Sequence, residues 1–168
     1  RRCARLRALA RRQERAWSRL MQQLGRRQRV ARRLLGSAPA APDGTGSRAP
    51  AAFEAALAAL DAPLDAAERA RREWELERAL GCLIDGLRGS GALAADAGLR
   101  RMEHDLVEVE DHIHYLRRYH NAVVRDLQQG LDQVSPHCLA RFLRVKPHAL
   151  FQPEAAFERQ IARARRGC

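Results

Sequence analysis

A long stripe of apolar residues restricts the folds open to this chain more than any other feature. The stripe steps by three and four residues through Leu106, Val109, Ile113, Leu116, His120, Val123, Leu127, Leu131 and Val134. Side chains at this spacing lie on one face of an α-helix, and that face must be buried against other helices. A helix of about 30 residues is roughly 45 Å long. The stripe therefore predicts long antiparallel partner helices.

The rest of the chain supplies those partners. A first helix is predicted from about residue 3 to Leu35, ending at Gly36, because its apolar residues repeat at helical spacing: Leu6, Leu9, Trp17, Leu20, Leu24, Val30 and Leu34. Residues 37–50 contain three prolines and no large apolar side chain, which predicts a loop. A second helical pattern starts near Phe53, breaks at Pro63 and resumes after Asp65, which has Glu68 at capping distance. Gly89 and Gly91 mark its end.

The end of the long stripe is also marked. Pro136 stops that helix because proline lacks an amide hydrogen, and residues 138–145 predict a short C-terminal helix. No stretch alternates with period two, so a sheet is not expected. We predict an all-α fold, namely an antiparallel up-and-down bundle of three long helices, one of them broken, plus a short C-terminal helix. The length of 168 residues favours one domain over residues 1–168.

Two separated blocks of residues resemble the LemA family. The block along the stripe comprises Leu106, Glu110, Ile113, Arg117, Asn121, Val124, Ala140, Pro147 and Phe151. The block in the first helix comprises Trp17, Leu24, Arg26, Arg27, Val30, Leu34 and Leu35. The chain departs from the family pattern at His120, where tyrosine is usual, and at Arg29 and Arg32, which replace an aspartate and a proline.

The resemblance implies a location. LemA-like proteins carry one transmembrane helix just before the matching first helix, so we expect an anchor upstream of Arg1, which is not a starting methionine. The chain itself has no apolar run of 18 residues. The resemblance thus implies a non-enzymatic protein-interaction scaffold at the bacterial inner membrane, facing the cytoplasm, with an unknown protein partner.

Positive charge is concentrated in the first helix. Residues 1–36 contain 13 arginines and one glutamate, a local charge of +12 against +11 for the whole chain. Basic residues 1–33 could lie beside an anionic membrane, bind nucleic acid, or form an ordinary solvated face. The alternative to the scaffold is therefore a soluble basic helical module that binds nucleic acid or an anionic membrane surface. Nucleic acid is the less favoured partner because no zinc-finger spacing or RNP motif is present.

The sequence contains no recognisable catalytic arrangement. G-x-S-x-G, P-loop, GxGxxG and HExxH motifs are all missing, and the four cysteines form no CxxC pair. His104, Glu108 and His112 share a helix face and could hold a metal. Their acidic neighbours Asp105 and Asp111 instead predict a solvated face. We therefore expect no enzyme activity, cofactor, metal or small-molecule substrate.

The polar signature positions are the remaining candidates for a site. They are Arg26, Arg27, Glu110, Arg117 and Asn121, and the apolar signature positions are Trp17, Leu106, Ile113, Pro147 and Phe151. Buried polar side chains need hydrogen-bonding partners. We therefore predict a polar network between helices that fixes their register, with His120 packed as an aromatic ring.

Overall fold

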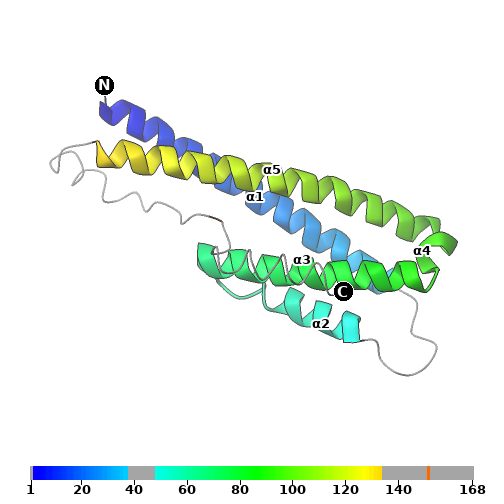
Figure 1. Cartoon of the computed structure of the whole chain (residues 1–168). Coiled ribbons are helices and arrows are strands. Elements are labelled where there is room, and N and C mark those ends of the chain that lie inside the picture. The colour runs from blue at the N-terminus through cyan, green and yellow to red at the C-terminus, as the bar shows by residue number, and fades with distance from the viewer. Residues whose placement is uncertain (1, 38–47, 134–150, 152–168) are drawn as a thin grey trace.

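All regular secondary structure in the computed structural model is α-helical over the residues that it describes, which are 2–37, 48–133 and 151 (Figure 1). The elements in order are α1 (Arg2–Ser37), α2 (Arg48–Ala58), α3 (Ala66–Gly89), α4 (Ala92–Ala95) and α5 (Ala97–Asp132). The predicted all-α class is confirmed. Pro136, Pro147 and the expected short helix at 138–145 lie outside the described residues.

The two longest helices form the frame of the bundle. α1 and α5 have 36 residues each, run in opposite directions and pack side by side (Figure 1). α3 runs antiparallel to α5, and α2 lies against α3 on the outer side of the bundle (Figure 1). This is the expected antiparallel up-and-down arrangement.

The core is built along the bundle from three groups of apolar residues. The largest joins α1 to α5 at the end where α3 turns into α4, and includes Leu34, Phe53, Leu80, Leu93 and Leu106. The middle group places Leu20 and Leu24 of α1 against Val109 and Ile113 of α5. The third pairs Leu6 with Leu127, near the start of α1 and the end of α5. The stripe that predicted α5 is therefore its buried face.

The break at Pro63 is a reversal of chain direction. The sequence predicted one long helix with a break, whereas α2 ends at Ala58 and folds back along α3 (Figure 1). Seven residues separate the two helices, which is enough chain for a turn. Asp65 caps α3 as expected, since its side chain accepts a hydrogen bond from the amide of Glu68 at 2.8 Å.

The remaining helix boundaries follow local rules. Gly91 has φ +74°, the left-handed conformation that glycine adopts without steric cost after a helix end. Asp96 caps α5 through the amides of Gly98 and Leu99. Residues 38–47 of the expected loop at 37–50 lie outside the described residues. Of the remainder, Ser37 belongs to α1, and α2 begins at Arg48. Pro50 is compatible with the latter because proline is tolerated in a first helical turn.

Candidate functional site

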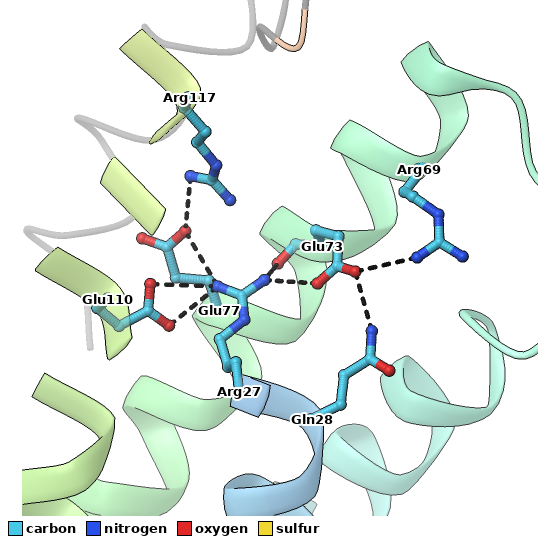
Figure 2. Close-up of polar contacts among 7 residues, drawn as sticks. All are labelled: Arg27, Gln28, Arg69, Glu73, Glu77, Glu110 and Arg117. Atoms are coloured by element: carbon cyan, nitrogen blue, oxygen red, sulfur yellow. Dashed lines mark hydrogen bonds and ion pairs between the residues drawn. The ribbon is translucent and has the colours of Figure 1, made fainter. Parts of the chain in front are cut away.

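A buried arginine joins three helices at the middle of the bundle. Arg27 lies on the core face of α1 and its side chain is fully buried. Figure 2 shows its guanidinium between α3 and α5. Nη2 donates to the Glu73 carboxylate at 2.6 Å and to the Glu73 carbonyl oxygen at 2.9 Å, and Nη1 donates to Glu110 at 2.9 Å. One side chain therefore connects α1 to both of its long neighbours.

Glu73 is the fully buried anion of this network. Besides Arg27, its carboxylate accepts a hydrogen bond from Nε2 of Gln28 at 2.9 Å and lies 3.5 Å from the guanidinium of Arg69 (Figure 2). Burying a carboxylate costs several kcal/mol, on the order of the effective penalty per ion, unless hydrogen bonds and opposite charge offset it. These contacts supply that compensation.

Arg117 and Glu77 extend the network toward solvent. Arg117 of α5 reaches Oε2 of Glu77 on α3 at 3.4 Å, and the same oxygen lies 3.8 Å from Arg27. Glu77 and Glu110 remain 30% and 31% exposed at their side chains, whereas Glu73 is 0% exposed. The network therefore extends from the buried Glu73 to the partly exposed carboxylates of Glu77 and Glu110, whereas Arg117 is 23% exposed at its side chain.

The two arginines experience opposite electrostatic environments. Burial alone would lower the pKa of Arg27, but the charges of Glu110 and Glu73 and their hydrogen bonds raise it above its ordinary value. Burial lowers the pKa of Arg117, and the positive charge of Arg27 lowers it further against the opposing effect of Glu77. Arg27 is thus the better compensated cation, although both guanidiniums stay charged at physiological pH.

Asn121 makes a separate polar contact. Its side-chain amide donates to the carbonyl oxygen of Phe151 at 3.2 Å, and its carbonyl accepts from the Phe151 amide at 2.9 Å. Both main-chain groups of Phe151 are thereby paired. The Phe151 ring packs 5.8 Å from Trp17 and 5.6 Å below the guanidinium of Arg117, measured to the ring centroid. Asn121 therefore holds Phe151 on the α1–α5 pair.

The predicted site residues separate into two groups. Arg27, Glu110 and Arg117 come together in the network, and Asn121 holds Phe151 next to it. Arg26 is half-buried, and over the described ranges its side chain forms no ion pair or hydrogen bond. Among the apolar positions, Leu106 and Ile113 are buried in the core, Trp17 is half-buried, and Pro147 lies outside the described residues.

The sequence interpretation missed the acidic partners on α3. Glu73 and Glu77 take part in four of the five ion pairs of the network, yet the sequence did not single them out among the many charged residues of α3. The position of Glu73 in the apolar pattern of α3 could have identified it from the sequence. Glu73 falls on the buried face of α3, three residues after Ala70 and three before Leu76, both of them buried. A carboxylate at a core position predicts a buried cation on a neighbouring helix.

The histidine face of α5 is solvated, as its acidic neighbours predicted. His104 and Glu108 are 74% and 54% exposed, and His104 Nε2 lies 3.7 Å from the carboxylate. Within the residues that the structure describes, no three histidine, cysteine or acidic side chains are placed to hold a metal ion. His120 differs, because it is fully buried with its ring 5.3 Å from Trp17.

The chemistry of the network is structural. Three guanidiniums, from Arg27, Arg69 and Arg117, face three carboxylates, from Glu73, Glu77 and Glu110, so the charges balance. Paired charges fix the geometry of the side chains. The arrangement holds α1, α3 and α5 in one relative position.

The comparisons with known proteins agree with this architecture. No curated protein matches the chain. The family model described as LemA family matches residues 16–164, which include the three arginines of the network, their carboxylate partners and the Asn121 contact. The match thus covers α3, α5, the part of α1 from residue 16 onward and most of the chain, and the protein belongs to the LemA family.

Proposed function

We propose that this LemA-family protein is a non-enzymatic scaffold at the bacterial inner membrane. In this proposal the helical bundle faces the cytoplasm, an upstream helix anchors it, and α1 lies near the anionic leaflet. The family is generally membrane-associated and is not a known enzyme family. Over the part of the chain that the structure describes, no helix combines the length and apolar character needed to cross a bilayer.

The main support for the proposal is the set of exposed arginines on the outward face of α1. Its core face is occupied by the contacts with α3 and α5, and five of its exposed arginines lie at helix positions on the opposite side. The exposed arginines on that side are Arg7, Arg11, Arg15, Arg29 and Arg33. They span 26 residues, or roughly 39 Å of helix. Each basic residue close to an anionic leaflet contributes about 1 kcal/mol of attraction, so such a row favours a negatively charged surface.

Membrane fractionation of the native full-length protein tests the anchor. We expect the protein to stay in the membrane fraction through a high-salt wash and through an alkaline carbonate wash. Release by salt alone would mean that the arginine row holds the protein on the surface without an anchor. Absence from the membrane fraction before any wash would overturn the proposal.

Vesicle binding tests the arginine row directly. The variant Arg11→Ala/Arg15→Ala/Arg29→Ala/Arg33→Ala should bind vesicles rich in anionic phospholipid at least 10-fold more weakly, because its outward charge is lost. A matched variant removes four exposed arginines from other helices, as Arg71→Ala/Arg101→Ala/Arg118→Ala/Arg125→Ala, with the same change in net charge. Equal losses in both variants would contradict a specific role for α1.

One observation favours a second candidate, the binding of single-stranded nucleic acid. Tyr115 and Tyr119 on α5 stack with ring centroids 6.4 Å apart and planes at 7°, and Tyr115 is 65% exposed. Arg12 donates from Nε to the Tyr119 hydroxyl at 2.8 Å. Aromatic rings beside arginines can stack on bases. Salt-dependent binding of a 20-nucleotide strand that Tyr115→Ala weakens, together with no retention at membranes, would favour this function.

A further inference from the structure

A groove of about 390 Å³ lies between α3 and α5, on the side where the ionic network reaches solvent. Its apolar lining comprises Leu80, Ile84, Leu106 and Val107. Leu80 and Leu106 are 3% and 2% exposed, whereas Val107 is 54% exposed. Val107 and Tyr115 are the two large hydrophobic side chains left exposed in the described part of the chain. Val107 therefore offers apolar surface at the rim that the bundle itself does not cover.

The walls of this groove carry the opposite charge from α1. Four carboxylates line it, from Glu77, Glu103, Glu110 and Asp111, against two guanidiniums, from Arg88 and Arg117. Glu103 accepts a hydrogen bond from Nε of Arg88 at 3.0 Å, and Glu110 is held by Arg27. Asp111 is exposed and forms no ion pair with any described residue. Glu77 and Glu110 are paired with Arg27 and Arg117, and Glu103 with Arg88, so Asp111 supplies the unpaired negative charge of the groove in a chain whose net charge is +11.

We propose that this groove docks a basic amphipathic helix of a partner protein. The proposal rests on the scaffold function and names the kind of partner that the scaffold would hold. An aliphatic side chain of the partner would cover Val107, and an arginine or lysine one turn away would pair with Asp111. This is the helix-in-groove mode of recognition, in which apolar anchors give affinity and complementary charge gives orientation.

The chemistry of the groove selects this occupant. From Glu103 to Arg117 the α5 wall extends over 14 residue steps, or about 21 Å, which matches roughly four turns of a helix. Nucleic acid is a poor fit because the unpaired carboxylate of Asp111 would repel its phosphates. The arginine row of α1 from a second copy is also a poor fit, because Arg7, Arg11 and Arg15 bring no apolar side chain for Val107.

A defined peptide tests the proposal in solution. The probe is a fluorescent 18-residue helical peptide with a leucine stripe flanked by arginines, and its counterpart carries glutamate in place of arginine. We expect the arginine peptide to bind the whole chain at least 10-fold more tightly by fluorescence anisotropy. Asp111→Arg should weaken that binding at least 10-fold, and Val107→Asn should weaken it several-fold. Circular dichroism checks that both variants keep the wild-type helix content.

The control variant makes the same change of charge at a position outside the groove. Glu54→Arg alters an exposed glutamate on α2, which does not line the groove, and binding should stay within twofold of wild type. Equal weakening by Glu54→Arg and Asp111→Arg would overturn the proposal, because net charge would then explain the binding. So would equal binding of the two peptides. Since no membrane is present, this result is independent of the fractionation that tests the scaffold function.

Discussion

Arg27 decides whether the centre of the bundle is stable, because its charge is buried together with that of Glu73. A buried ion pair adds little net stability relative to apolar side chains, but removal of one partner strands the other charge away from water. Glu110 and Glu77 are less vulnerable, since about a third of each side chain already contacts solvent. Loss of Arg27 would therefore destabilise the protein mainly because the buried Glu73 carboxylate would lose its paired cation.

Replacement of Arg27 should destabilise the protein strongly. We expect Arg27→Met to lower the free energy of unfolding by about 3–5 kcal/mol, the usual cost of leaving a buried charge unpaired. Urea unfolding followed by circular dichroism measures it. Arg26→Met is the matched control, because the neighbouring arginine is half-buried outside the network, and its effect should stay within about 0.5 kcal/mol. Similar losses in both variants would show that the network does not stabilise the fold.

Arg117 should matter less than Arg27. Arg117→Ala removes the 3.4 Å contact with Glu77 and the guanidinium above the Phe151 ring, but Glu77 keeps access to water. We expect a loss of about 1–2 kcal/mol, which corresponds to one charged hydrogen bond, and a lower melting temperature. An unchanged melting temperature with weaker partner binding would instead identify Arg117 as a contact residue of the surface.

At the scale of elements, the sequence predicted those features that depend on a single helix, namely its buried face and its first residue. The three- and four-residue steps of α5 predicted its buried face, and Asp65 predicted the start of α3. The hairpin of α2 and α3 was not predictable in the same way. A proline such as Pro63 ends a helix, but the direction of the next helix depends on tertiary contacts, here Phe53 and Leu57 packing in the same group as Leu80.

Only part of the candidate site could be predicted from the sequence, because its contacts join side chains of different helices. Arg27, Glu110 and Arg117 stood out through the family resemblance, whereas their partners on α3 did not. Which side chains meet between helices depends on how the helices are aligned, and the sequence of one helix does not contain that information. Arg26 illustrates the limit, because adjacent residues of a helix point about 100° apart and only Arg27 faces the core.

The cap of α3 gives a test at this scale. Asp65→Ala removes the hydrogen bond to the amide of Glu68 and should cost about 1 kcal/mol of unfolding free energy. Asp61→Ala at the other end of the same turn removes the surface ion pair with Arg32, whose side chains are 66% and 51% exposed. That change should cost well under about 1 kcal/mol. Equal effects would mean that the cap is not formed in solution.

For the whole molecule, the network removes an ambiguity in the alignment of α1. One core position of α1 repeats every seven residues and is almost fully buried throughout, as Leu6, Gln13, Leu20, Arg27 and Leu34. A shift of α1 by seven residues, about 10.5 Å, would again place large side chains toward α3 and α5. In such a shifted state Arg27 would leave Glu73 and face an apolar region. The ion pair therefore penalises shifted alignments more than the apolar contacts do.

A double variant separates stability from alignment. Arg27→Met/Glu73→Leu removes both buried charges, and the partners Gln28 and Arg69 are only partly buried and can turn to water. We expect it to recover at least about 2 kcal/mol relative to Arg27→Met, since apolar pairs commonly replace buried ion pairs without loss. Urea unfolding measures the recovery, with wild type and both single variants completing the cycle.

The amide NMR spectrum of the same double variant then tests the role in alignment. Wild type should give one set of sharp peaks, because only one alignment pairs Arg27 with Glu73. The double variant should give broadened or duplicated peaks from α1 while remaining folded, because a buried polar contact can fix one register among apolar alternatives. If stability recovers and the spectrum stays single and sharp, the apolar core alone aligns the helices, and the charges of Arg27 and Glu73 serve another purpose.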